Sequence, residues 1–84
     1  MAYNQFKISL PTKQDIFEFV VACEKYDEEI TYVSGRYVQD ARSLLGMMSI
    51  PHSENAEVTI HTENMKILDK FLDDIFKWIQ KRKE

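Results

Sequence analysis

The stretch of sequence that decides the fold is Arg42-Ser43-Leu44-Leu45-Gly46-Met47-Met48-Ser49-Ile50. Its apolar residues predict a short helix, which Gly46 weakens and which Pro51 cannot continue, because proline lacks the backbone N–H that a helix needs. Ser43 stands at the predicted start, where its side chain can accept a hydrogen bond from a free backbone N–H. The helix is apolar on every side, so it cannot bury all of its large side chains.

Two short runs rich in Tyr, Val and Thr precede this helix, at residues 30–33 and 36–38. The pair Ser34-Gly35 between them can supply the positive φ of a tight hairpin, so the two runs are expected to form antiparallel strands. After the helix, polar residues at 52–55 predict a loop. Apolar and polar side chains then alternate at residues 57–61, which predicts a further strand.

The segment before residue 11 also alternates between apolar and polar side chains, and it predicts a half-buried strand that Pro11 closes. Thr12 and Asp15 then form the pattern of a capping box, in which a hydroxyl and a carboxylate each satisfy a backbone N–H at the start of a helix. The first helix is therefore expected to start at Thr12. The apolar residues that follow at helical spacing are Ile16, Phe19, Val20 and Cys23.

The strongest helical pattern covers residues 65–79, and Thr62 is its expected N-cap. The basic residues from Lys77 to Lys83 are interpreted as a solvated helix end, where cations complement the carbonyl end of the helix dipole. The predicted order is β-α-β-β-α-β-α, an α+β fold whose helices pack on one face of the sheet. The apolar face of the helix predicted over residues 65–79 consists of Met65, Leu68, Leu72, Ile75 and Ile79.

Length and composition limit the classes of function. The 84 residues, 44% of them hydrophobic, are enough for one domain over residues 1–84. A net charge of -3 argues against a general nucleic-acid surface, which needs clustered positive charge. The single cysteine, Cys23, cannot form an internal disulfide and favours a reducing compartment. No apolar run approaches the ~20 residues that span a bilayer, so a cytoplasmic protein without a membrane segment is expected.

The sequence contains no constellation that indicates an enzyme. Its two glycines and two histidines leave no glycine-rich phosphate loop, no nucleophile–base pair and no cluster of metal ligands. Neither a metal nor another cofactor is expected. His52 lies in the predicted loop and His61 at the end of the last strand, and both are interpreted as surface imidazoles.

The element order and residues 42–50 resemble the HPr (histidine-containing phosphocarrier) family. The stretch matches the basic-Ser-hydrophobic-hydrophobic-Gly-hydrophobic-Met-Ser-hydrophobic segment of HPr proteins from Gram-positive bacteria, and Phe19-Val20 and Glu29-Ile30-Thr31 fall in register with it. The resemblance covers essentially the whole chain. It implies an open-faced β-sandwich of four antiparallel strands with three helices on one face, and a protein of the phosphotransferase system family.

The family's phosphoryl-transfer motif is not retained. In competent members a Gly-Leu-His-Thr-Arg-Pro-Ala type motif opens the first helix, and its histidine takes a phosphoryl group from enzyme I. Counted back without gaps from Phe19, Thr12 occupies the histidine position, Gln14 the arginine position and Asp15 the proline position. A threonine phosphate is an ordinary ester without a large transfer potential, and Asp15 would repel a phosphate. The chain therefore resembles Crh-like members, which lack the phosphoacceptor histidine and keep the serine.

For Ser43 the resemblance implies regulatory phosphorylation. In the Gram-positive family the matching serine is the target of HPr kinase/phosphorylase, and its phosphorylated form acts with a LacI-type transcriptional regulator. A phosphate on Ser43 would lie at a helix start with Arg42 adjacent. The apolar helix beside it is interpreted as a protein-docking surface. The residues expected to form this surface are Arg42, Leu44, Leu45, Met47 and Met48.

The expected function is a non-catalytic regulatory module, a monomer or weak dimer, whose partners are other proteins. Two alternatives remain open: a phosphocarrier of the sugar phosphotransferase system that uses a non-standard site, and a diverged structural or interaction protein without phosphorylation. For Ser43 the alternative is a plain N-cap serine worth about 1 kcal/mol. For the apolar side chains of Leu44, Leu45, Met47 and Met48, the alternative is that they complete the core.

Overall fold

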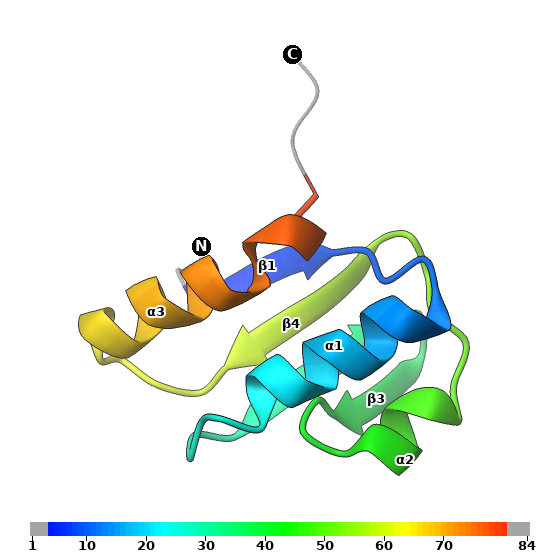
Figure 1. The fold of residues 1–84 in the computed structure, drawn as a ribbon, viewed down its shortest axis with the longest axis horizontal. Coiled ribbons are helices and arrows are strands. Elements are labelled where there is room, and N and C mark those ends of the chain that lie inside the picture. Colours follow the sequence, from blue (N-terminus) through cyan, green and yellow to red (C-terminus); the bar gives the residue numbers. More distant parts are fainter. Residues whose placement is uncertain (1–3, 81–84) are drawn as a thin grey trace.

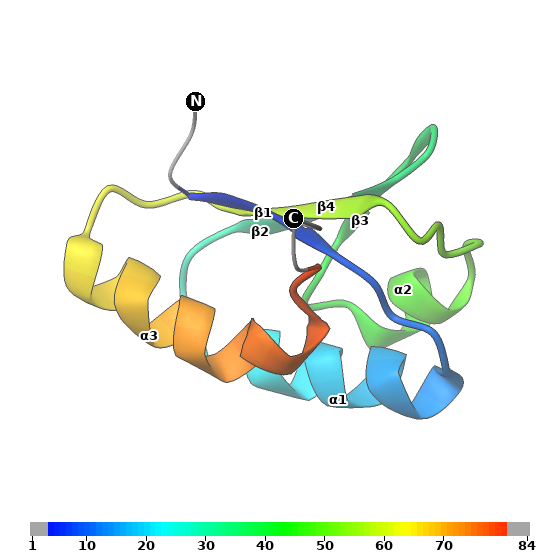
Figure 2. The same cartoon turned by 90° about the horizontal axis from the view of Figure 1, so that it is seen from above.

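The computed structural model describes residues 4–80 and has the predicted α+β architecture. Four strands form one antiparallel sheet in the order β1-β4-β2-β3, and all three α-helices lie on the same face of it (Figures 1 and 2). The elements follow one another as β1 (Gln5–Ile8), α1 (Lys13–Cys23), β2 (Ile30–Ser34), β3 (Tyr37–Asp40), α2 (Leu44–Met48), β4 (Ala56–Ile60), α3 (Met65–Ile75) and the 3-10 helix η1 (Phe76–Trp78).

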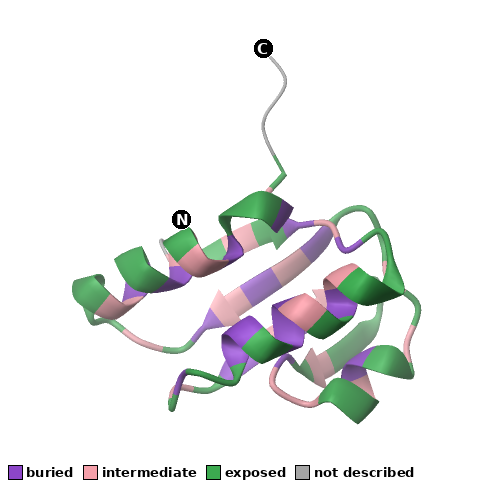
Figure 3. Cartoon of the chain, viewed as in Figure 1, coloured by how far each residue is buried: buried purple, intermediate pink, exposed green. Residues whose placement is uncertain are grey.

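Alternation of side chains in the two central strands divides the sheet into a buried and an exposed face. Along β2 and β4 every second residue is buried, as Figure 3 shows for β4. Tyr32, Val58 and Ile60 point toward the helices and are completely buried, and Phe19 of α1 and Phe71 of α3 cover them. Burial of each such side chain contributes roughly 1.5–3 kcal/mol, so this layer holds the sheet and helices together.

The hairpin between β2 and β3 forms around Gly35. Its φ of 61° is the positive value that a two-residue hairpin turn requires, and a side chain at this position would be strained. Because Arg36 completes the turn, β3 begins at Tyr37, one residue later than predicted, and continues to Asp40.

The start of α1 was predicted correctly and the start of α3 was not. Thr12 caps α1 through a complete capping box with Asp15. The N-cap of α3 is Asn64, whose Oδ1 accepts hydrogen bonds from the N–H groups of Lys66 (2.9 Å) and Ile67 (3.4 Å). Thr62, the predicted cap, instead accepts a hydrogen bond from the N–H of Asn64 (3.1 Å), which holds the turn that leads into the helix.

The last helix is shorter than its apolar pattern predicted. α3 ends at Ile75, η1 follows, and residues 78–80 then run beside β1, where Ile79 pairs with Ile8. This edge offers unpaired backbone groups, which is why the chain leaves the helix there. Met65, predicted on the apolar face, is 59% exposed. Of the predicted basic helix end, Lys77 lies in η1 and residues 81–83 lie outside the described range.

Within residues 4–80, none of the helices has the length and apolar character needed to cross a bilayer.

Candidate functional site

Helix α2 is held against the sheet by one side and exposes the other. Its N-cap is Ser43, whose Oγ accepts a hydrogen bond from the N–H of Gly46 (3.2 Å). Gly46 lies directly against the side chain of Gln39 in β3, and a Cβ at this position would collide with the amide of Gln39. Leu45 is 83% exposed, whereas Met47 is completely buried. The short helix therefore presents Leu45 to solvent while Met47 anchors it.

Met47 does not belong to the docking surface expected from the sequence. Helical geometry turns Met47 about 100° away from Met48 and about 200° away from Leu45. The side of α2 that carries Met47 faces the core, so this side chain joins the core cluster. Leu44 and Met48, on the flank opposite Gly46, are both partly exposed.

Helix α1 adds two apolar side chains that the sequence analysis did not assign to a site. Figure 1 shows α1 between α3 and α2. Asp15 and Glu18 lie on the flank of α1 that faces the C-terminal segment, where they bond Trp78 and Lys77. Phe17 and Val21 lie on the other flank, about 100–140° from the buried stripe, and both are exposed. This flank faces α2, which contacts α1.

Five exposed apolar side chains therefore lie on two neighbouring helices. We refer to them as the α1–α2 surface: Phe17, Val21, Leu44, Leu45 and Met48. The spacing of four between Phe17 and Val21, both outside the buried stripe, was the signal in the sequence that could have revealed them.

Arg42 stabilises the loop that follows α1. Its guanidinium donates hydrogen bonds to the backbone carbonyls of Tyr26 (3.1 Å) and Asp27 (3.4 Å), after the end of α1. Its Nε lies 3.7 Å from Oδ1 of Asp40, too far for a hydrogen bond. The expectation that Arg42 takes part in docking receives no support from this position.

His52 bridges α2 and the core, and the interpretation of this residue as a surface imidazole was wrong. It is half-buried, and its Nε2 donates to the carbonyl oxygen of Met47 (2.7 Å). A carbonyl can only accept, so Nδ1 of the neutral ring accepts from the hydroxyl of Tyr32 (2.8 Å). His61 is exposed as expected, with its Nε2 bonded to Oγ1 of Thr31 (2.8 Å). His52 thus fixes the last turn of α2 to strand β2.

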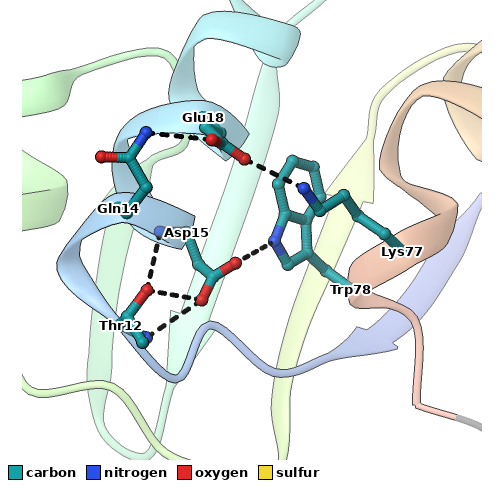
Figure 4. A network of polar contacts seen from close by, with 6 residues as sticks. All are labelled: Thr12, Gln14, Asp15, Glu18, Lys77 and Trp78. Atoms are coloured by element: carbon teal, nitrogen blue, oxygen red, sulfur yellow. Dashed lines mark hydrogen bonds and ion pairs between the residues drawn. The ribbon is translucent and has the colours of Figure 1, made fainter.

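The start of α1 holds a negative charge supplied by the chain itself (Figure 4). Oδ2 of Asp15 accepts hydrogen bonds from the backbone N–H (3.2 Å) and the hydroxyl (2.6 Å) of Thr12. The indole N–H of Trp78 donates to Oδ1 (3.0 Å). These bonds from Thr12 and Trp78 lower the pKa of Asp15, because they favour its charged form.

Glu18 extends this network along α1. It accepts hydrogen bonds from the amide of Gln14 (2.9 Å) and from Nζ of Lys77 (3.0 Å). The bond from Gln14 and, second to it, the bond from Lys77 lower the pKa of Glu18, because both favour its charged form. Gln14 and Asp15, at the positions that match the family's arginine and proline, are therefore both engaged in contacts within the chain.

Other candidate chemistry is missing from the part of the chain that the structure describes. Within residues 4–80 no group of three or more His, Cys, Asp or Glu side chains could hold a metal ion. Cys23 is buried without a disulfide partner, and burial raises the pKa of its thiol to about 12. It is therefore not a reactive thiol.

We expect acid to loosen the contact between the C-terminal segment and α1. The folded-state pKa of Asp15 is depressed, so its contribution to stability is present above its ordinary pKa of about 3.8 and is lost as the pH falls through the lower, folded value. Trp78 is the only tryptophan, so its fluorescence should change in a step below about pH 4. Asp15→Asn should lack this step. An identical titration of the variant would contradict the assignment.

Comparison with known proteins assigns the fold. No protein-family model matches the sequence, and no match is found among curated proteins. Among solved structures, the crystal structure of HPr-C-His from Thermoanaerobacter tengcongensis matches with a TM-score of 0.66 and 19% sequence identity, over 87% of this chain and 90% of that chain. The fold is therefore that of HPr, an open-faced sandwich with helices on one side of an antiparallel sheet.

Proposed function

We propose that this chain is a non-catalytic regulatory module with an HPr fold, which binds other proteins through the α1–α2 surface and does not transfer a phosphoryl group from one protein to another. The observation that supports this proposal is the group of five exposed apolar side chains on two adjacent helices. Contiguous apolar patches of a few hundred Å² on small proteins are commonly interaction sites. Leu45, which is the most exposed of the five and lies in the first turn of the short helix, is the expected hot spot.

The contacts that hold α2 in place favour a docking role for the α1–α2 surface over the alternative that its side chains are exposed because α2 packs incompletely. Met47, Gly46 and His52 each fix α2 through a separate contact, with the core, with β3 and with β2. An exposed side chain on a rigidly held helix loses less conformational entropy on binding than one on a mobile segment. Met48 adds an adaptable side chain at the edge of the same surface.

The start of α1 argues against the alternative of a phosphocarrier. Thr12 stands at the position that matches the family's histidine, and the carboxylate of Asp15 occupies its hydrogen-bonding groups. A phosphoryl group there would meet this carboxylate at close range. His52 lines the same hollow as Thr12 at this helix start, but both of its nitrogens are bonded within the chain. The Nε2 of His61 bonds Thr31 in β2.

A charged substitution at Leu45 tests the docking proposal. Leu45→Asp should weaken partner binding by roughly 30-fold or more, because hot-spot residues contribute about 2 kcal/mol or more. The free energy of unfolding should change by less than about 0.5 kcal/mol. Met65→Asp, which alters another exposed apolar side chain, on α3, is the matched control. A partner captured by the wild-type chain should be titrated calorimetrically against both variants. Equal affinity for the two variants would refute the proposal.

We further propose that phosphorylation of Ser43 by HPr kinase/phosphorylase regulates this surface and its binding to a transcriptional regulator. A phosphate on Ser43 would lie at the N-terminal end of α2, next to Leu44, and would add about two negative charges. Treatment with the kinase and ATP should add one phosphate, detected by mass spectrometry. Ser43→Ala should abolish it. Ser49→Ala, which alters the exposed serine at the other end of α2, should leave it unchanged. Phosphate gained equally by Ser43→Ala would contradict this assignment.

A further inference from the structure

The two edges of the sheet differ in how their backbone groups are used. On β1, the N–H of Ser9 donates to the carbonyl of Trp78 (3.0 Å), and the carbonyl of Lys7 accepts from the N–H of Gln80 (2.9 Å). The chain's own C-terminal segment therefore covers this edge. On β3, by contrast, no strand within residues 4–80 pairs on the side away from β2.

The hydrogen-bond pattern shows which groups of β3 point outward. The N–H of Ala41 donates to the carbonyl of Ile30 (2.9 Å), so residue 41 faces β2. Alternate residues of a strand direct their backbone groups to opposite sides, and Val38 and Asp40 therefore direct theirs away from β2. The carbonyl of Asp40 already accepts from the N–H of Ser43 (2.9 Å). Both groups of Val38 and the N–H of Asp40 remain at the open edge.

The side chains along this edge are complementary to those of the same edge in a second copy of the chain. Val38 is 64% exposed, and it pairs with Val33 on the face of the sheet opposite the helices. Asp40 lies two residues after Val38 in the strand, so its side chain projects to the same face, and Arg36 lies in the hairpin turn two residues before Val38. A hollow of about 200 Å³ beside Asp40 includes Glu29 in its lining. The edge thus carries a cation at one end, an apolar centre and acidic groups at the other end.

We propose that β3 pairs antiparallel with β3 of a second copy of this chain, with Val38 opposite Val38. This register places Arg36 of each copy opposite Asp40 of the other, and the outward backbone groups of Val38 bond across the two-fold axis. A register centred on Asp40 would bring two carboxylates together. One centred on Gln39 would bury Asp40 against Val38. Charge therefore favours the register centred on Val38 over these two.

The expected association is weak and reversible. A four-residue strand buries an area well below that of a standard stable interface. We therefore expect a dissociation constant of about 0.1 mM. Two Arg–Asp pairs in an exposed contact are screened by salt, so association should weaken as the salt concentration rises. This proposal shares no residue with the α1–α2 surface and does not rest on the proposed function.

Sedimentation velocity of the 84-residue chain from about 5 µM to about 1 mM tests the proposal. The sedimentation coefficient should rise from a monomer to a dimer value, and Arg36→Glu should weaken the association by roughly tenfold or more, because it replaces two attractions by two repulsions. Lys66→Glu in the first turn of α3 makes the same change in charge away from the edge and should have no effect. A monomer at every concentration, or an Arg36→Glu variant that dimerises normally, would overturn the proposal.

Amide hydrogen exchange locates the contact. Exchange at Val38 and Asp40 should slow several-fold between the monomeric and dimeric concentrations, because pairing protects their outward N–H groups. Gln39, which faces Tyr32 in β2, already bonds within the sheet and serves as the internal control. A dimer in which Val38 and Asp40 exchange as fast as in the monomer would place the contact elsewhere and refute the pairing.

Discussion

Replacement of Trp78 by alanine is expected to lower the free energy of unfolding by about 3–5 kcal/mol, the largest effect of any single change proposed for the C-terminal segment. Trp78 is only 6% exposed and packs edge-on against Phe19, with ring centroids 5.5 Å apart. Its indole N–H bonds Asp15, and Lys77 covers its ring at 5.1 Å. The substitution removes all of these contacts and leaves a cavity between α1 and the C-terminal segment.

Thermal unfolding followed by circular dichroism measures this effect without the lost fluorophore. For a domain of this size the loss corresponds to a decrease in melting temperature of roughly 12–40 °C. Trp78→Phe keeps most of the packing and loses the indole N–H, so it should fall between the wild type and Trp78→Ala. A loss of less than about 1 kcal/mol for Trp78→Ala would show that the C-terminal segment contributes little to the fold.

The second large effect is expected for His52→Ala. This change removes the donor to the carbonyl of Met47 and the acceptor for the hydroxyl of Tyr32, which is completely buried. Burial also raises the pKa of Tyr32 to about 12, so its hydroxyl stays neutral and needs a hydrogen-bond partner. Each of these two unsatisfied groups costs about 1–3 kcal/mol, which gives an expected loss of roughly 2–6 kcal/mol.

The effect of His52→Ala should concentrate in α2. Amide exchange over residues 44–48 should accelerate more than exchange in α3, and partner binding to the α1–α2 surface should weaken although none of its five residues has changed. His61→Ala is the control, because His61 is exposed and makes a single hydrogen bond to Thr31. If both histidine variants behaved alike, His52 would not be the link between α2 and β2.

The sequence predicted those features that depend on residues close together along the chain. Thr12 and Asp15 are three residues apart, and their capping box formed as expected. The hairpin turn required only Gly35 and its neighbours. The β-α-β-β-α-β-α order followed from periodicities of two and 3.6 residues, which report which face of each element is buried. The HPr fold was implied by the resemblance of this order and of residues 42–50 to that family.

Predictions at the ends of helices were less accurate because several local solutions compete. Asn64 and Thr62 can both cap α3, and only the path of the chain between β4 and α3 selects Asn64. The apolar pattern of α3 continues to Ile79, yet the open edge of β1 takes residues 78–80 out of the helix. A strand edge that lies about 70 residues away in sequence leaves no signal in the local pattern.

The sequence by itself indicated the fold, the position of Ser43 at the start of a short apolar helix, and the capping box of Thr12 and Asp15 at the start of α1. Only the tertiary structure decided how the apolar side chains of α2 divide, with Met47 in the core and Leu45 outside, and that Phe17 and Val21 lie beside them. It also decided that Arg42 and His52 stabilise neighbouring segments. Periodicity reports which residues share a face, whereas packing between elements distant in sequence determines which faces are covered.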